Sequence, residues 1–299
     1  MRSFKHILNV IVVRLVELMG PFLNDKIYLR WKWHFKMGGK LDFDNPKAFN
    51  EKLQWLKLYD RKPEYTTMVD KIKVKDYIAE KIGAEYLIPT IGVWDAPEDI
   101  DFDSLPNQFV LKCNHNSGGL FICKDKTKVA KKQWADVLKG LRKSLDYNYY
   151  MLGREWPYKN VEPKLIAEEF LESDSSRDLM DYKFMCFNGN VKCVFVCSRR
   201  GTKDGLRVTF FDLDWNVLPF TRSHPAEDSP IPKPRSLKLM VELATKLSMG
   251  IPFVRVDFYE IDGKVYFGEM TFFPGNGYEA FEPEEWDYKL GEWIKLPNK

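Results

Sequence analysis

The sequence has few of the features that mark a secreted, repetitive or metal-binding protein. Only five of its 299 residues are cysteines, an odd number, and none forms a CxxC pair. Such cysteines predict buried, reduced thiols rather than disulfides or a metal site, which suits the cytoplasm. Neither a repeat nor a stretch rich in Pro, Gly or Ser is present, so we expect any subdomains to pack closely together.

The net charge is small overall, but an excess of positive charge lies near the N-terminus. The formal net charge of +3 argues against a general nucleic-acid-binding protein. Residues 1–80, however, hold 16 Lys and Arg against 10 Asp and Glu. This basic region contains the apolar run ILNVIVVRLVELMGPFL at 7–23, so that charge and apolar surface coincide.

The apolar run at 7–23 is too short to span a bilayer. Arg14 and Glu17 interrupt it, and it falls short of the ~20 apolar residues that a spanning helix needs. A signal peptide is not expected either, since no small-x-small cleavage site follows the run. Two interpretations stay open: a helix packed on the core, or an interfacial helix that makes a peripheral contact with an anionic membrane.

The spacing of apolar residues predicts helices in the first part of the chain and short strands after it. Residues 1–80 are expected to be mostly helical, with one helix over MVDKIKVKDYIAEKI, and residues 131–145 have the same spacing. Strands are predicted at 88–94, 108–114 and 164–171. The expected organisation is a helical N-terminal region, 1–80, and a core, 81–299, with subdomains at about 84–165 and 166–299.

Two β-hairpins are the clearest local signals in the sequence. Residues 181–198 carry Asn188-Gly189 between two apolar strands, and residues 253–273 carry Asp262-Gly263. These dipeptides tolerate the positive φ that two-residue hairpin turns need. An amphipathic helix is predicted between the hairpins, within residues 230–250. Helices combined with mainly antiparallel hairpins predict an α+β fold.

A lysine followed by a glycine-containing loop is the first candidate site. Lys112 ends the predicted strand QFVLKC and precedes a loop with Ser117, Gly118 and Gly119. Glycines let backbone N–H groups approach an anion closely, and phosphate is the natural guest. The segment also fits an ordinary polar turn after a strand. It is not a Walker loop, because no GxxxxGK[ST] is present.

Two carboxylates in the second hairpin form the other candidate site. Asp257 and Glu269 lie in otherwise apolar sequence, where an unpaired carboxylate would be costly to bury. A three-residue loop would place them opposite each other, whereas a two-residue loop would put them on opposite faces, and both stay open. In register, they suit Mg²⁺ that is shared with nucleotide phosphates. Arg255 points the same way and either offsets phosphate charge or forms a salt bridge with Glu269.

Four segments of the sequence carry a resemblance to a known family: NPKAFNEKLQWLKLYDRK, LPNQFVLKCNHNSGG, MLGREWPYKN and GEMTFFPGNGYEAFEPEEWDYKLGEWIKLP. They are similar to the TupA-like branch of the ATP-grasp superfamily, a branch named for teichuronopeptide biosynthesis in bacteria, and the resemblance runs over most of the chain from about residue 45. The resemblance implies an ATP-grasp fold, the cofactors ATP and Mg²⁺, and a role in cell-surface polysaccharide or capsule assembly.

The resemblance also implies roles for individual residues. Lys71 and Lys112 match the lysines that contact nucleotide phosphates, and residues 117–119 match the glycine-rich flap over the triphosphate. The adenine-binding hinge matches Glu168, Glu169, Phe170 and Leu171. The ribose-binding acid matches Asp181, and Lys183 matches a group that reaches phosphate or substrate. The arginine that steadies an acyl-phosphate matches Arg199 or Arg200.

The metal ligands of the superfamily match only in part. Asp257 and Glu269 resemble two of them. Where the superfamily usually has asparagine as a third magnesium ligand, this chain has Thr271. Either the Thr271 hydroxyl or Asn276 would take that place, so the number of magnesium ions stays open.

The reaction implied by the resemblance is carboxylate–amine ligation. ATP would phosphorylate a carboxylate, and an amine would displace phosphate from the acyl-phosphate to give an amide. The expected substrates are a uronic acid or amino acid and an amino sugar or amino acid. Two other classes stay open: a sugar or glycan kinase, which leaves phosphate on its product, and a glycosyltransferase, which prefers a UDP-sugar to ATP.

Overall fold

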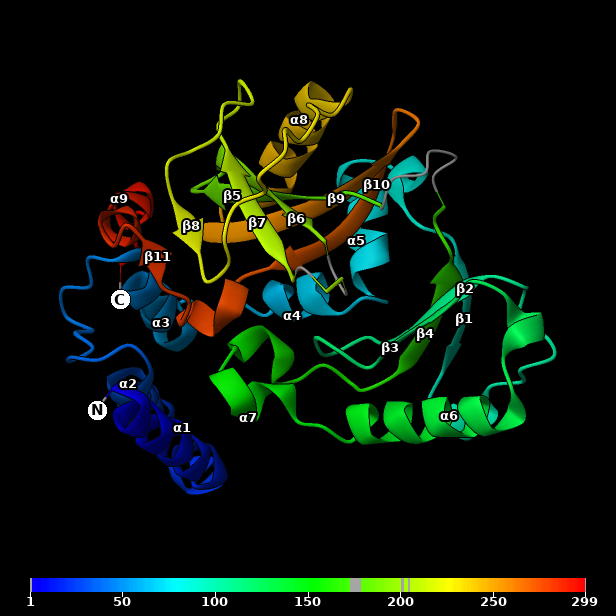
Figure 1. Ribbon diagram of the computed structural model, residues 1–299, viewed down its shortest axis with the longest axis horizontal. Coiled ribbons are helices and arrows are strands. Elements are labelled where there is room, and N and C mark those ends of the chain that lie inside the picture. The colour runs from blue at the N-terminus through cyan, green and yellow to red at the C-terminus, as the bar shows by residue number, and fades with distance from the viewer. Residues whose placement is uncertain (1, 173–178, 200–201, 204, 299) are drawn as a thin grey trace.

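Two antiparallel sheets form the centre of the molecule (Figure 1). The computed structural model describes residues 2–172, 179–199, 202–203 and 205–298, with the backbone alone for residues 2–7. Helix α8 (Leu237–Ser248) covers the outer face of the larger sheet, and α6 (Lys131–Leu145) covers the outer face of the smaller one. The other two faces look toward the middle of the molecule, as expected for a mixed α+β fold.

Five α-helices make up most of residues 2–81, as the sequence predicts. They are α1 (Arg2–Leu18), α2 (Asp25–Lys36), α3 (Phe49–Tyr59), α4 (Glu64–Val69) and α5 (Val74–Lys81). Helix α2 begins after Asn24, whose side-chain oxygen accepts a hydrogen bond from the Ile27 backbone N–H at 2.9 Å. This contact satisfies one of the N–H groups that a helix start leaves unpaired.

The break between α4 and α5 corrects one prediction. A single helix over MVDKIKVKDYIAEKI is wrong, because the backbone at Asp70 is extended. The Asp70 carboxylate accepts a hydrogen bond from the Ile72 N–H at 2.9 Å, a local turn that competes with the helix. Lys71 therefore lies in a turn, where its backbone N–H donates to the Asn114 carbonyl at 3.2 Å.

The smaller sheet has the strand order β1-β4-β2-β3. Its strands are β1 (Thr90–Trp94), β2 (Phe109–Cys113), β3 (Leu120–Cys123) and β4 (Leu165–Glu169), of which β3 is not predicted by the sequence. Phe109, Leu111 and Cys113 belong to the core beneath α6, and the Cys113 Sγ lies 3.9 Å from the Leu141 carbonyl oxygen. Because strand side chains alternate, Lys112 points to the opposite, inner face.

The larger sheet has the strand order β10-β9-β5-β6-β7. Its strands are β5 (Asp181–Phe187), β6 (Asn190–Ser198), β7 (Arg207–Phe211), β9 (Phe253–Ile261) and β10 (Lys264–Thr271). Both predicted hairpins are present, with φ of 49° and 79° at Asn188 and Gly189 and of 52° and 84° at Asp262 and Gly263. Helix α8 packs on the outer face, where the Cys186 Sγ lies 3.9 Å from a carbonyl oxygen of the helix.

A β-bulge at Gly268 sets the register of the second hairpin. The turn has two residues and Lys264 pairs with Ile261, but the ladder slips by one residue between Phe267 and Glu269. Glu269 therefore lies directly opposite Asp257. A Cβ at position 268 would lie 3.1 Å from the Asp257 carbonyl oxygen, so glycine suits the bulge. Two residues in the turn and one in the bulge thus have the effect of a three-residue loop.

The C-terminal part closes the core with aromatic side chains. Its elements outside the larger sheet, apart from α8, are β8 (Thr221–Arg222), β11 (Phe281–Glu282) and α9 (Glu285–Trp293), and β8 pairs with β11. Helix α7 (Tyr149–Gly153) lies earlier in the sequence. The Trp293 ring lies 5.2 Å from that of Phe187, and the Trp286 ring stacks on Phe220 at 4.4 Å. These contacts give α9 a structural role in closing the core.

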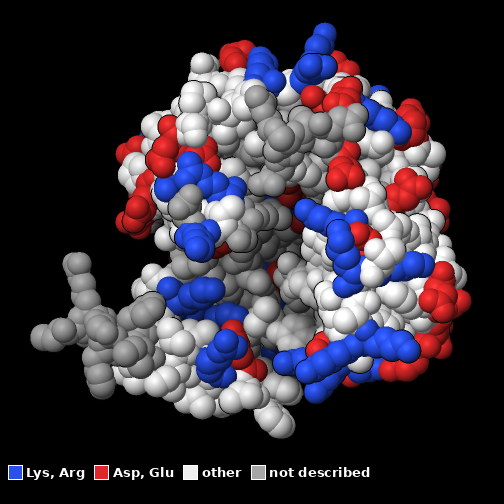
Figure 2. All heavy atoms as spheres, turned by 45° about the vertical axis from the view of Figure 1, so that its right-hand side comes forward, with Lys and Arg blue, Asp and Glu red and all other residues white. Residues whose placement is uncertain are grey.

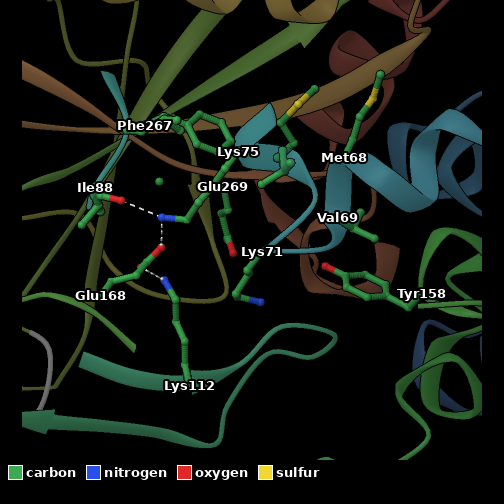
Figure 3. Close-up of a pocket in the computed structure, with 14 residues that line it drawn as sticks. Met68, Val69, Lys71, Lys75, Ile88, Lys112, Tyr158, Glu168, Phe267 and Glu269 are labelled. Atoms are coloured by element: carbon green, nitrogen blue, oxygen red, sulfur yellow. Dashed lines mark hydrogen bonds and ion pairs between the residues drawn. The ribbon is translucent and has the colours of Figure 1, made fainter. Parts of the chain in front are cut away.

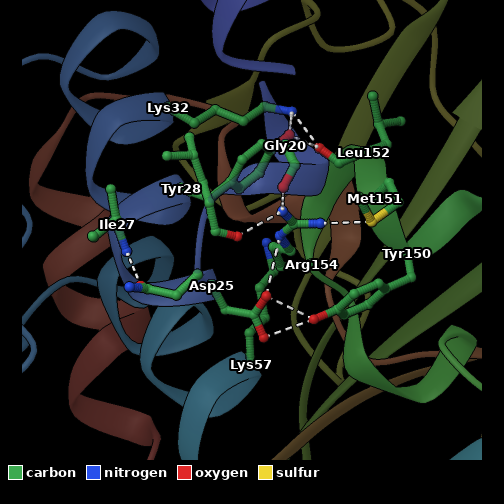
Figure 4. Close-up of polar contacts among 12 residues, drawn as sticks. Gly20, Asp25, Ile27, Tyr28, Lys32, Lys57, Tyr150, Met151, Leu152 and Arg154 are labelled. Atoms are coloured by element: carbon green, nitrogen blue, oxygen red, sulfur yellow. Dashed lines mark hydrogen bonds and ion pairs between the residues drawn. The ribbon is translucent and has the colours of Figure 1, made fainter. Parts of the chain in front are cut away.

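Buried Arg154 fastens the N-terminal helices to the rest of the molecule (Figure 4). Its Nη2 donates to the Gly20 carbonyl at 2.5 Å, and its guanidinium lies 4.2 Å from the centre of the Tyr28 ring. Asp25 forms an ion pair with the Nε of Arg154 at 3.2 Å and accepts hydrogen bonds from the Tyr150 hydroxyl at 2.7 Å. Segments more than 120 residues apart are thus held together.

Two apolar cores accompany the two sheets. One lies between the smaller sheet and α6, and the other joins the larger sheet to α8, α9 and the N-terminal helices. The N-terminal helices therefore share a core with the larger sheet. The division into a region 1–80 and subdomains at about 84–165 and 166–299 stays a prediction.

Candidate active site

A pocket lies between the inner faces of the two sheets (Figure 3). It encloses about 420 Å³ of space, part of it open to solvent. Its polar lining consists of Lys71, Lys75, Lys112, Tyr158, Glu168 and Glu269. The space-filling view shows a hollow between two lobes, with Lys and Arg side chains on both of its rims (Figure 2).

One buried carboxylate on the smaller sheet is paired with two lysines. The Nζ of Lys75, from α5, lies 2.7 Å from Oε1 of Glu168, and Lys112 Nζ is paired with Oε2 (Figure 3). Lys75 also donates to the Ile88 carbonyl at 2.6 Å. Burial alone would raise the pKa of Glu168, but the two ammonium groups hold it below its ordinary value. The carboxylate is therefore ionised, and the cluster keeps one excess positive charge.

Lys71 extends into the pocket from the turn between α4 and α5. Its Nζ donates to the Asn116 carbonyl at 2.7 Å. Figure 3 shows the Lys71 ammonium, the Glu269 carboxylate and the Tyr158 hydroxyl pointing into the same space. Burial lowers the pKa of Lys71, and the Glu269 carboxylate opposes that effect. An additional anion in this space would favour the charged ammonium further.

The loop after Lys112 has an exposed backbone that depends on glycine. It connects β2 with β3 at the end of the smaller sheet that faces α7 (Figure 1). Gly118 and Gly119 have φ of 118° and 58°. A Cβ at Gly119 would lie 2.1 Å from the Ser144 Oγ, while Ser117 and Gly118 are exposed. Exposed N–H groups in such a conformation are able to cradle an anion.

Asp257 is buried on the inner face of the larger sheet and is paired with two cations. Arg255 donates from Nε to Oδ1 at 2.7 Å and from Nη2 to Oδ2 at 2.6 Å. Lys183, opposite Asp257 on β5, is paired with the same Oδ2, and its Nζ lies 2.6 Å from Asp181 Oδ2. Burial and Arg255 would lower the pKa of Lys183, but the Asp257 and Asp181 carboxylates raise it above its ordinary value.

Glu269 joins this cluster from β10 and is its most accessible acid. Its side chain is 41% exposed, against 2% for Asp257. Its Oε1 accepts hydrogen bonds from Arg255 Nη2 at 2.5 Å and from the Thr271 hydroxyl at 3.1 Å. Burial opposes ionisation, but Arg255, Lys183 and Lys71 lower the pKa of Glu269 to about 2. The salt bridge between Arg255 and Glu269 is thus present in this structure.

The charges on the two sides of the pocket fit a nucleotide accompanied by Mg²⁺. On the larger sheet three carboxylates are paired with two cations, and of these five groups Glu269 lines the pocket itself. On the other side, three lysines face one carboxylate. Among the described residues, no group of three His, Cys, Asp or Glu side chains is able to hold a metal alone. Magnesium in nucleotide sites takes one or two protein carboxylates and completes its shell with phosphate oxygens and water. Asp257 and Glu269 suit that kind of binding.

The predicted adenine hinge contributes one side chain to the pocket. Glu168 lines it, whereas Glu169 is exposed and Phe170 and Leu171 are half-buried beyond the end of β4. A hinge that acts through backbone groups does not require its other side chains to face the pocket. The roles of these residues stay predictions.

The predicted acyl-phosphate arginine and third metal ligand are placed as follows. Arg199 forms an ion pair with Glu227, with its Nε 3.0 Å from Oε2, and Arg200 lies outside the described residues. The Asn276 side chain lies against Gly153, where a Cβ would meet its Oδ1. Of the two candidates for the third ligand, Thr271 is the one in contact with Glu269.

Two polar residues of the pocket, Lys75 and Tyr158, are not predicted by the sequence pattern. Lys75 follows Lys71 by four residues, and this repeat of lysine was the available signal. Tyr158 belongs to MLGREWPYKN, where an aromatic residue reveals no chemical role by itself. Burial and the nearby Glu155 carboxylate raise the pKa of Tyr158 well above its ordinary value, so that its hydroxyl stays protonated.

The sequence model for TupA-like ATP-grasp proteins matches residues 51–295. The chain belongs to this family. The family and the ATP-grasp fold are therefore confirmed. None of the curated proteins matches the chain.

Solved structures similar to this ATP-grasp protein include three ligases. A D-alanine–D-alanine ligase from Bacillus anthracis complexed with ATP has 17% identity and a TM-score of 0.43, over 76% of this chain and 65% of that one. The D-alanine–D-alanine ligase from Helicobacter pylori has 15% identity and a TM-score of 0.43, over 84% of this chain and 70% of that one. The ATP-grasp ligase PsnB, complexed with a precursor variant, Mg and ADP, has 11% identity and a TM-score of 0.42, over 82% of this chain and 66% of that one. The chain spans less than two thirds of the length of the first of these.

Proposed function

We propose that the protein is an ATP-dependent carboxylate–amine ligase that acts through an acyl-phosphate. The observation that carries this proposal is the opposition of charge across one pocket. Asp257 and Glu269 lie in register on one sheet, and Lys71 and Lys112 reach the pocket from the other side. A magnesium-bound triphosphate carries both signs of charge that such a pocket would bind.

The lysines and the glycine loop would hold the nucleotide. Lys71 and Lys112 lie within reach of the pocket and would form charge-assisted hydrogen bonds with phosphate oxygens. Binding of phosphate would draw Lys112 from Glu168, which keeps Lys75 as its partner at 2.7 Å. Backbone N–H groups at 117–119 would close over the phosphates. The adenine and ribose roles of residues 168–171 and Asp181 are proposed on the resemblance alone.

The inner face of the larger sheet would carry the chemistry. Asp257, Glu269 and the Thr271 hydroxyl are the proposed ligands of Mg²⁺, which when bound would neutralise charge on the transferring phosphoryl group. Arg255 already donates to both carboxylates and would fix their geometry while offsetting phosphate charge. Lys183, held between Asp181 and Asp257, would supply a second fixed cation near the phosphates. Positioning would supply most of the catalysis.

The proposed substrates are a carboxylate and an amine destined for a surface glycan. We assign the carboxylate to a uronic acid or amino acid and the amine to an amino sugar or amino acid. This part rests on membership of the TupA-like family and on its implied role in polysaccharide or capsule assembly. An acyl-phosphate is a suitable intermediate, because it couples ATP cleavage to amide formation within one site.

Mass spectrometry of the products tests this proposal. The protein is incubated with ATP, Mg²⁺ and pairs drawn from uronic acids, amino sugars and amino acids. The expected result is a product whose mass equals the two substrates less one water, together with ADP and free phosphate. Hydroxylamine should trap the acyl-phosphate as a hydroxamate when the amine is left out. A phosphorylated product would instead identify a kinase, and consumption of a UDP-sugar without ATP a glycosyltransferase.

A further inference from the structure

Helix α1 and the turn after it present a continuous row of large apolar side chains to solvent. The row, here called the α1 stripe, consists of Leu8, Ile11, Leu15, Leu18 and Phe22, which are between 49% and 89% exposed. Successive members are three or four residues apart, the spacing of one helix face. Single exposed apolar residues are ordinary, but a row along one face marks an interaction surface.

The opposite face of α1 is already in use. Val16 is buried against the core, and Val12 packs beside it. Glu17 forms an ion pair with Lys32 of α2 at 2.8 Å. Arg154 holds the following turn through its hydrogen bond to the Gly20 carbonyl. The helix is thus fixed by one face, and the α1 stripe is not needed for that attachment. The interpretation of residues 7–23 as a helix packed on the core therefore accounts for only one of its two faces.

The segment of sequence that carries the α1 stripe is basic. The first forty residues contain eight Lys and Arg against two Asp and Glu. The Arg14 side chain, on α1 itself, is 76% exposed. On α2, Ile27 and Trp31 are also exposed and lie one helical turn apart, and tryptophan favours the boundary between lipid and water. Apolar surface and positive charge thus occur together on this part of the molecule.

We propose that the α1 stripe docks on an anionic lipid surface, with its apolar side chains among the acyl chains and its basic neighbours at the headgroups. A basic helix with one apolar face is the usual form of an interfacial helix. A second copy of the chain fits less well, because it would bring two strongly basic segments face to face. No helix of the described residues is long and apolar enough to cross a membrane, so the contact would be peripheral.

Flotation with lipid vesicles tests this proposal. Full-length protein is mixed with vesicles of phosphatidylcholine alone or of phosphatidylcholine and phosphatidylglycerol in equal amounts. Wild type should float with the anionic vesicles, and rising salt should release part of it, because salt screens the headgroup charge. The double variant Leu15→Glu/Leu18→Glu should bind at least about tenfold more weakly, because two charges would enter the apolar layer.

Two further variants separate the contributions of apolar surface and charge. Met249 is an apolar residue at the end of α8, away from the α1 stripe, and is 72% exposed. The variant Met249→Glu should therefore bind vesicles as wild type does. Arg14→Glu should weaken binding to anionic vesicles and leave binding to neutral vesicles unchanged. All variants should melt near wild type, since the substituted side chains are exposed.

Several outcomes would overturn the proposal. Wild type that ignores anionic vesicles would do so, as would a double variant that binds them as well as wild type. Sedimentation gives a third: a wild-type dimer that the double variant converts to monomer would assign the α1 stripe to an interface between copies. If the double variant unfolds, the response of Arg14→Glu to vesicle charge decides. Nucleotide binding is unaffected by any of these outcomes, so the proposed enzymatic function stands or falls separately.

Discussion

The two sides of the pocket bury charge in opposite ways. On the smaller sheet, one carboxylate, Glu168, is the shared partner of Lys75 and Lys112. On the larger sheet, Asp181, Lys183, Asp257, Arg255 and Glu269 form a chain of ion pairs in which the inner members have two partners. Removal of any one acid from this series of ion pairs leaves both of its cations with a carboxylate partner. Removal of Glu168 instead takes away the shared ionic partner of two lysines.

This difference teaches that stability and ligand binding should respond differently on the two sides. On the side of the smaller sheet, a single acid, Glu168, is the ionic partner that holds the two lysine side chains in place. On the larger sheet one ionic partner is able to replace another, a property that suits the proposed binding of a metal. The following predictions rank variants by the loss of stability that this comparison predicts.

Glu168→Gln should give the largest loss of stability. It leaves the Lys75 and Lys112 side chains, which are only 16% and 19% exposed, without a carboxylate. Breaking a buried ion pair by removing one partner costs about 3 kcal/mol or more. Denaturant unfolding of the variant measures the loss. The matched control is Glu169→Gln, because Glu169 is the exposed neighbour of Glu168. This change should alter the free energy of unfolding by less than about 0.5 kcal/mol. If both changes lowered the free energy of unfolding equally, the prediction that Glu168 is the essential ionic partner of the two lysines would be wrong.

Asp257→Asn should cost less, about 2 kcal/mol, although Asp257 is the more deeply buried acid. Arg255 retains Glu269 as a partner, and Lys183 retains Asp181. The variant should nevertheless lose the rise in melting temperature that we expect Mg-ATP to give wild type, because a proposed metal ligand is missing. Melting with and without Mg-ATP checks both parts. A variant that melts early but keeps the full shift would show that Asp257 is purely structural.

Gly268→Ala should lower the free energy of unfolding by about 1 kcal/mol. Its main effect should be on nucleotide binding. The added Cβ would lie 3.1 Å from the Asp257 carbonyl oxygen and 3.2 Å from the Tyr259 ring, so the bulge must shift. Displacement of the bulge would move Glu269 relative to Asp257 and weaken the Mg-ATP shift. Gly140→Ala in α6 is the control: nothing lies near its Cβ, and it should stabilise the protein by up to about 1 kcal/mol. An unchanged Mg-ATP shift in Gly268→Ala would contradict this role of the bulge.

Glu269→Gln should give the smallest loss, less than about 1 kcal/mol at neutral pH, because its side chain is 41% exposed. The pKa of Glu269 is lowered from 4.5 to about 2 in the folded state. A lowered folded pKa means that the ionised form stabilises the fold, so this contribution is present above pH 4.5 and disappears as pH falls toward 2. The difference in unfolding free energy between wild type and variant should therefore shrink over that window. A difference that is constant with pH would contradict the ion pair with Arg255.

Local turn chemistry made much of the larger sheet predictable. Asn188-Gly189 and Asp262-Gly263 have the positive φ that their sequences predict, since asparagine, aspartate and glycine tolerate that region. The helix predicted at 131–145 has those bounds in the structure. In each case residues close in sequence determine the conformation, and no distant contact has to be known.

Features that depend on contacts across the chain were not predictable in the same way. The register of Asp257 and Glu269 depends on the bulge at Gly268, where a glycine inside a strand was the available signal. The break at Asp70 is held by distant Asn114, whose side chain donates to the Asp70 carboxylate at 2.9 Å and whose carbonyl accepts from the Lys71 N–H at 3.2 Å. Lys75 contacts Glu168 across almost a hundred residues, and no local pattern indicates that pairing.

Arg154 also has a consequence for the order of events during synthesis of the chain. The contacts that tie Gly20, Asp25 and Tyr28 to the later part of the chain come from residues 150–154. At ribosomal speed, these partners follow the N-terminal helices by on the order of ten seconds. During that interval α1 is outside the ribosome with α2 as a partner, through the Glu17–Lys32 ion pair, while the Arg154 contact to the turn after α1 does not yet exist. A nascent chain is therefore able to meet a lipid surface or a chaperone through α1 before the pocket between the two sheets has formed.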